Sequence, residues 1–224
     1  MDMKSVNEMN SICKKYGIKN YTIMDDGSID VDGYVDLYGN GLTELPLTFN
    51  KVTGTFNCDD NKLTDLKGSP KSVGVFFCGS NNLTDLEFSP EKVGGDFHCF
   101  GNKLTSLEGS PESVGGKFYC EYNKLTSLEG SPESVGGGFD CEYNNLTSLE
   151  GGPKVVGGVY LCDNNYLTNL NETSITFDDS AQNNEYNSKA KAIAYTLDNN
   201  LFIANSTNPK IAVTDISDKN IVSG

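Results

Sequence analysis

Apolar and polar positions in the central part of the chain follow one pattern that recurs along the sequence. The segment NKLTSLEGSPESVGG occurs letter for letter at residues 102–116 and again at residues 123–137. In each copy a Phe and a Cys two residues apart precede an Asn, two Leu three residues apart, a Gly-Ser-Pro turn, a Val and a glycine pair. A repeat of this length predicts a solenoid, in which each unit buries its apolar face only against its neighbours.

The alternation of Phe and Cys is typical of a strand with one face turned inward. The Asn that follows is expected at a backbone turn, where its amide can bond unsatisfied backbone groups of its own and the next coil. The two Leu carry the chain round the coil, Pro holds an extended return segment too short for a full helix, and Val closes the core. The asparagine column is Asn40, Asn61, Asn81, Asn102, Asn123, Asn144 and Asn165.

The two ends of the chain depart from this pattern. Residues 1 to about 17 predict a helix, with Ser5 and Glu8 as a capping box, and an Asp-Gly turn predicts a hairpin over residues 21–31. We expect these elements to cap the first coil, because a bare solenoid end exposes core and a sheet edge. The chain is therefore divided into residues 1–33, about seven repeats over residues 34–170, and residues 171–224.

Residues 171–224 predict short strands at 191–197, 201–206 and 210–216, between Asn-rich and Pro-containing segments. The first of these segments also fits a helix face, through Ala190, Ile193, Ala194 and Leu197. Two interpretations remain open. The segment is either a C-terminal cap that covers Leu167, Leu170 and the last coil, or a small β module with a binding role of its own.

The motif F-x-C-x-x-N-x-L-T-x-L resembles the leucine-rich repeat, whose consensus reads L-x-x-L-x-L-x-x-N-x-L. The short copies with LTSLEGSP are most similar to the bacterial and bacteriophage subclass. The opening IKNYTI, followed by DGSIDVDG, is similar to the start of uncharacterised repeat proteins encoded by bacteriophages. The resemblance implies a mostly β, curved right-handed solenoid with a parallel sheet on its concave side, used to bind proteins. It implies neither a specific partner nor an activity.

Composition narrows the classes of partner. The net charge is -14, the sequence pI is about 4.4, and the chain contains no arginine. Phosphate contacts need clustered Lys and Arg, so neither a nucleic-acid nor an anionic-membrane partner is expected. The chain has no apolar run of roughly 18 residues and no apolar core of a secretion signal near its start, so a cytoplasmic location is expected.

Six of the seven cysteines occupy the same place in successive repeats: Cys58, Cys78, Cys99, Cys120, Cys141 and Cys162. Free cysteines are among the most buried residue types, and we expect this column to be reduced core. Side chains stacked in one column do not point at one another as a disulfide requires, and they do not converge as zinc ligands do. No metal or other cofactor is expected.

The outward positions beside the Phe and Cys columns vary from copy to copy and are the candidates for recognition. They hold aromatic side chains surrounded by carboxylates, the usual composition of a protein interface. The alternative is that exposed aromatics merely shield the sheet. The candidate partner-binding residues are Phe77, Asp96, His98, Phe100, Lys117, Tyr119, Glu121, Tyr122, Asp140, Glu142, Tyr143, Leu161 and Asp163.

Catalysis is not expected on this face. His98, the only histidine, lies among carboxylates, but no nucleophile is predicted beside it, because Cys99 points into the core. The carboxylates lack the glycine-rich spacing of calcium-binding solenoids. We therefore expect a non-enzymatic module that binds a protein through its concave face. The resemblance to bacteriophage repeat proteins implies a phage-encoded factor that targets a host protein, such as a defence protein. The alternative is a structural component of a phage particle, and the oligomeric state is left open.

Overall fold

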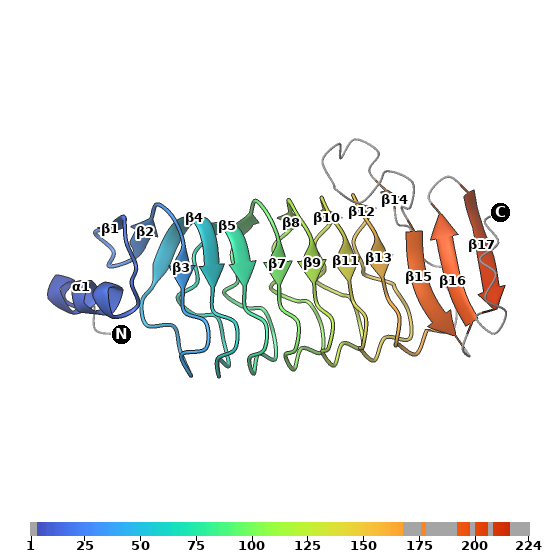
Figure 1. Ribbon diagram of the computed structural model, residues 1–224, viewed down its shortest axis with the longest axis horizontal. Helices are drawn as coiled ribbons and strands as arrows, with labels where there is room; N and C mark the ends of the chain where they lie inside the picture. The colour runs from blue at the N-terminus through green and yellow to red at the C-terminus, as the bar shows by residue number, and fades with distance from the viewer. Residues whose placement is uncertain (1–3, 168–175, 178–191, 198–199, 206–207, 216–224) are drawn as a thin grey trace.

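The computed structural model describes residues 4–167, 176–177, 192–197, 200–205 and 208–215 of the 224-residue chain. The chain forms a mostly β solenoid in which short coils succeed one another along the longest axis (Figure 1). A helix lies at the N-terminal end of this row, and strands longer than those of the neighbouring coils lie at the opposite end. The predicted fold class, a repeat solenoid with a parallel sheet, is confirmed.

The N-terminal helix and hairpin are present as predicted. Helix α1 spans Val6–Lys15, and the Ser5 hydroxyl accepts from the backbone N–H of Glu8 while the Glu8 carboxylate accepts from that of Ser5. Strands β1 (Tyr21–Ile23) and β2 (Ile29–Val31) pair antiparallel. Strand β2 also pairs in parallel with β4 (Phe49–Asn57), so the hairpin leads directly into the stacked coils.

Each coil contributes to two parallel ladders, whereas the repeat pattern predicted only the one that contains the Phe and Cys columns. The first, the Val ladder, contains the Val column that was expected only to close the core. It continues from β2 and β4 through β5 (Ser72–Phe77), β6 (Lys92–Val93), β8 (Ser113–Val114), β10 (Ser134–Val135), β12 (Val155–Val156) and β14 (Thr176–Phe177).

The second ladder, the Phe ladder, contains the Phe column. It begins at β3 (Val35–Asp36) and continues through β4, β5, β7 (Phe97–His98), β9 (Phe118–Tyr119), β11 (Phe139–Asp140) and β13 (Tyr160–Leu161). In coils such as that of Gly115 and Gly116, the glycine pair joins the two short strands. A β-carbon on Gly115 would lie 2.1 Å from the carbonyl oxygen of Gly94, so this bend admits no side chain.

The core is made of columns of identical side chains. Rings of the Phe column stack from coil to coil, with centroids 5.1 Å apart and planes 3° apart for Phe97 and Phe118. The Leu and Cys columns beside it are buried. The cysteines are free thiols, as predicted, and the Cys58 thiol donates to the carbonyl of Phe77 in the next coil at 3.2 Å.

The buried asparagines bridge adjacent coils, as Asn102 illustrates. Its Nδ2 donates to the carbonyls of Cys99 at 3.1 Å and Phe100 at 3.3 Å in its own coil. The same nitrogen donates to the carbonyl of Cys78 at 3.0 Å, and Oδ1 accepts from the N–H of Leu83 at 3.0 Å. Both of these partners belong to the preceding coil. The prediction that the asparagine bonds the next coil was therefore wrong in direction, since the turn brings its amide against the earlier strand.

Asn40, the first member of the asparagine column, does not share this role. It is exposed, and its Nδ2 donates to the carbonyl of Tyr38 in its own coil. The parallel Phe ladder begins in this coil, so no earlier coil of that ladder supplies backbone groups to bridge.

Strand β15 (Ala192–Leu197) continues the Phe ladder by pairing in parallel with β13, and β16 (Asn200–Asn205) and β17 (Asn208–Asp215) follow antiparallel. The described part of the segment with the ambiguous pattern is therefore a strand and not a helix, while Ala190 lies outside the described residues. Leu170, which the C-terminal segment was expected to cover, lies outside the described residues. Within the described ranges, no helix is long and apolar enough to cross a membrane.

Candidate binding face

The predicted binding residues lie where alternation along the Phe ladder places them. Phe97 and Cys99 are buried, while His98 and Phe100, between and beyond them, are partly buried. Tyr122 and Tyr143 are exposed, and the other predicted residues are partly buried. We call this outward side the ladder face. Its rows are Thr55, Asn57 and Asp59; Val75, Phe77 and Gly79; Asp96, His98 and Phe100; Lys117, Tyr119 and Glu121; Gly138, Asp140 and Glu142; Val159, Leu161 and Asp163.

An aromatic strip crosses three adjacent coils of the ladder face. Ladder pairing places Phe77 beside His98 and His98 beside Tyr119, and the ring centroids are 4.4 Å apart in both pairs. Phe100 lies at the edge of the same strip, with its centroid 6.3 Å from that of His98. Its ring covers Gly79, where a β-carbon would come within 2.6 Å of it. These side chains form one continuous aromatic surface.

His98 is packed as an aromatic ring and is not poised as a base. Its Nε2 is buried and has no hydrogen-bond partner. Burial lowers the pKa of His98 to about 4, against the opposing effect of Asp96, so the imidazole is neutral at pH 7. Burial also raises the pKa of the adjacent Cys99 thiol well above its ordinary value. A neutral thiol in the core gives this face no nucleophile of the kind that a His base activates.

Carboxylates gather on the coils that follow the aromatic strip. Glu121, Asp140, Glu142 and Asp163 occupy outward positions there. Burial, followed by repulsion from Asp140 and Glu142, raises the pKa of Glu121 to about 7. Burial raises the pKa of Asp140, and burial together with Asp140 and Asp163 raises that of Glu142. Glu121 Oε2 is buried without a hydrogen-bond partner. Several carboxylates are therefore close together on this part of the face, where burial separates them from water.

Tyr122 and Tyr143 form a parallel stack at the edge of the carboxylates. Their ring centroids are 4.4 Å apart, the planes differ by 7°, and the residues are 56% and 44% exposed. Both have left-handed backbones, with φ of 55° and 52°. Sequence reasoning placed them at the edge of the strip but missed this conformation. The available signal was the column itself, which holds Gly39, Asp60, Ser80, Gly101 and Asn164 in other coils.

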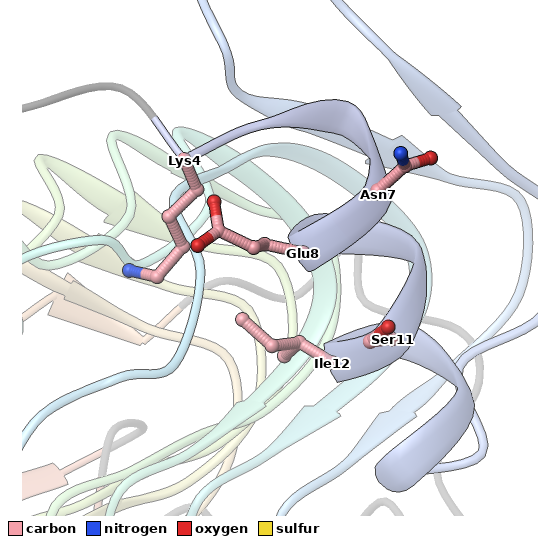
Figure 2. A pocket seen from close by; sticks show the side chains of 5 residues that line it. All are labelled: Lys4, Asn7, Glu8, Ser11 and Ile12. Atoms are coloured by element: carbon pink, nitrogen blue, oxygen red, sulfur yellow. The ribbon is translucent and has the colours of Figure 1, made fainter.

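A separate hollow lies along α1, at the N-terminal end of the row of coils. Figure 2 shows its lining side chains, Lys4, Asn7, Glu8, Ser11 and Ile12. The Glu8 carboxylate is already bonded to the backbone N–H and hydroxyl of Ser5. Over the part of the chain that the structure describes, no group of three or more His, Cys, Asp or Glu side chains could hold a metal ion.

Comparison with protein-family models gives no match, and a search of curated proteins finds no similar sequence.

Proposed function

We propose that this chain is a non-enzymatic interaction module of the leucine-rich-repeat type that binds a protein partner through its ladder face. The observation that carries the proposal is the aromatic strip formed by Phe77, His98, Tyr119 and Phe100. Its side chains are partly exposed, in contact with one another and located outside the core. Aromatic side chains with low conformational entropy supply much of the binding energy at protein interfaces.

The repeat itself supports this reading. The buried columns of Phe, Cys, Leu and Asn hardly change from coil to coil, whereas the outward positions vary widely in size and charge among the coils. The core does not require an aromatic side chain at an outward position, since Asn57 and Asp140 occupy the column of Phe77 in other coils. The aromatic strip is therefore explained better by recognition than by folding.

We further propose that the chain is a phage-encoded factor that acts on a host protein in the cytoplasm. This part rests on the resemblance of residues 18–33 to the start of bacteriophage repeat proteins. In the rival proposal, a structural component of a phage particle, the solenoid is a spacer. The end modules would then make the contacts, and strands β15, β16 and β17 lie at one end of the row of coils (Figure 1).

Affinity capture from a bacterial host lysate tests the proposal. The bait proteins are the wild type, the double variant Phe100→Ala, Tyr119→Ala, and the control Phe88→Ala. Phe88 is an aromatic residue, 51% exposed, in a Gly-Ser-Pro-type turn off the ladder face. Circular dichroism and thermal unfolding establish that each bait is folded.

We expect a partner that the wild type and Phe88→Ala retain and that the folded double variant loses. Retention of the same partner by all three baits would contradict binding through the ladder face and would direct attention to the end modules.

A further inference from the structure

The Tyr122–Tyr143 stack occupies backbone positions that disfavour tyrosine. A left-handed conformation costs a residue with a side chain roughly 1–2 kcal/mol relative to glycine, and it is rare for bulky residues. Other coils place Gly101, Ser80 or Asn164 at the same position with nearly the same φ. The solenoid therefore forms without tyrosine there, and the two rings are not needed to complete the fold.

The stack presents an uncovered ring face beside carboxylates. Because the two rings stack from coil to coil, the second face of Tyr122 looks toward the preceding coil, where Gly101 has no side chain to cover it. The N–H of Gly101 donates to the carbonyl of Glu121 at 3.0 Å, and that of Tyr122 to the carbonyl of Glu142 at 3.2 Å. Glu121 and Glu142 thus lie directly beside the Tyr122–Tyr143 stack.

The carboxylates on this part of the face repel one another. Repulsion from Asp140 and Glu142 acts on Glu121, whose Oε2 is buried without a hydrogen-bond partner. Burial raises the pKa of the Tyr122 hydroxyl, and so do its hydrogen bond with Tyr143 and the charges of Glu142 and Glu121. A positive group beside the exposed part of these side chains would relieve the repulsion.

We propose that this end of the ladder face binds an arginine side chain of the protein partner, with the guanidinium on the Tyr122 ring and paired with Glu121 and Glu142. The inference rests on the proposed protein-binding function and specifies the chemistry of the partner. The apolar part of the partner would lie on the aromatic strip, and its arginine would lie beside Tyr122.

Arginine fits these groups better than the other cations. Its guanidinium is planar, stacks on aromatic faces and donates two parallel hydrogen bonds to a carboxylate, whereas lysine offers a compact point charge. A metal ion needs ligands that converge on one point, and the described carboxylates form no such group. The chain itself contains no arginine that could lie beside Tyr122 in place of an arginine from the partner.

A labelled peptide tests the inference without knowledge of the partner. The probe is the acetylated, amidated repeat (Ser-Arg)4 with a fluorescein label, and its control replaces every arginine with neutral citrulline. Fluorescence anisotropy at about 0.15 M salt suppresses long-range attraction to the acidic protein. The variants are Glu121→Gln with Glu142→Gln, Tyr122→Ser, which copies Ser80, and the outer-face control Glu108→Gln with Glu129→Gln.

We expect the arginine peptide to bind the wild type roughly ten-fold more tightly than the citrulline peptide. The Glu121, Glu142 double variant and Tyr122→Ser should each weaken binding about ten-fold, while the Glu108, Glu129 control should bind like the wild type. The control also removes two carboxylates that are 21 residues apart, but it removes them from exposed return segments. It therefore separates a specific site from general attraction.

Equal loss in the two double variants, or equal binding of both peptides, would overturn the inference. Displacement of the peptide by calcium chloride, but not by sodium chloride of the same ionic strength, would assign the carboxylates to a metal ion and overturn it too. The capture experiment stays separate. A partner lost by Phe100→Ala, Tyr119→Ala but held by Glu121→Gln, Glu142→Gln would leave the proposed function standing and remove the arginine site.

Discussion

The ring of Phe100 lies on the backbone of Gly79, so closely that a β-carbon on Gly79 would approach the ring to 2.6 Å. The same repeat position holds Tyr38, Asp59 or Glu121 in other coils, so the glycine belongs to this coil and not to the repeat. The two neighbouring coils are thus complementary here, since one has no side chain where the next carries an aromatic ring. The aromatic strip is fitted to the sheet beneath it.

The first prediction concerns this pair. Gly79→Ala should displace the Phe100 ring and lower the free energy of unfolding by about 1 kcal/mol, because the added methyl overpacks a close contact. In a Phe100→Ala background the same substitution should have almost no effect, which gives a coupling energy of about 1 kcal/mol. Urea unfolding of the four proteins of this double-mutant cycle measures it. Equal costs in both backgrounds would show that the contact does not restrain the ring.

A second prediction compares two asparagines at one repeat position. Asn102→Ala removes the donor to the carbonyls of Cys78 and Cys99 and the acceptor for the N–H of Leu83, all in buried surroundings. We expect a loss of about 3 kcal/mol or more in unfolding free energy, because several buried backbone groups lose their partners. Asn40→Ala, at the exposed first position, should cost less than about 0.5 kcal/mol. Chemical denaturation of both variants measures the difference, and similar costs would contradict a bridging role for the buried asparagines.

Much of the fold was predictable because each coil buries the same kinds of side chain at the same repeat positions. The Phe and Cys columns gave the strand period, the capping box at Ser5 and Glu8 marked α1, and the Asp-Gly turn marked the hairpin. The second parallel ladder was missed, because Val114 in Ser113–Val114 is followed by a glycine pair and shows no alternation of apolar side chains like that of Phe and Cys. Only stacking with the coils on either side makes such segments strands.

The candidate face was predictable in part for the same reason. Alternation alone placed Phe77, His98 and Tyr119 on one side of the sheet, and ladder pairing then brought them into contact. The path of the chain between coils determines two further features. These are the left-handed backbone at Tyr122 and the contact of the Phe100 ring with Gly79. No local sequence period reports that path, so both features emerged only from the structure.

The third prediction concerns Phe88, which has a left-handed backbone with φ of 66° where other coils place Gly68, Gly109 and Gly130. Phe88→Gly and Phe88→Ala remove the same ring, but only glycine relieves the conformational strain. The glycine variant should therefore be more stable than the alanine variant by about 1 kcal/mol, the reverse of the usual order. Thermal unfolding of both variants measures this.

Glu108 supplies the comparison for Phe88, because it is exposed and is not among the residues with positive φ. There the alanine variant should be the more stable of the two. The same order at both positions would contradict strain at Phe88.

The last prediction follows from the charge on Glu121. Its pKa is raised from 4.5 to about 7 by burial and by the carboxylates of Asp140 and Glu142, so the folded state favours the protonated form. Below pH 4.5 both states are protonated and folding carries no penalty. As pH rises, the unfolded chain ionises first, so stability is lost progressively until the folded carboxyl has also ionised above about pH 7.

Glu121→Gln keeps the shape of the side chain and removes this titration. The variant should match the wild type near pH 4.5 and exceed it by about 1 kcal/mol at pH 8, a value well below the full shift because Glu121 is partly exposed to screening solvent. Urea unfolding between pH 4.5 and 8 measures the difference. A constant difference across this range would mean that Glu121 is ionised at little cost. A difference that grows with pH would show that this carboxylate destabilises the free protein, as expected for a group whose cation is supplied by a partner.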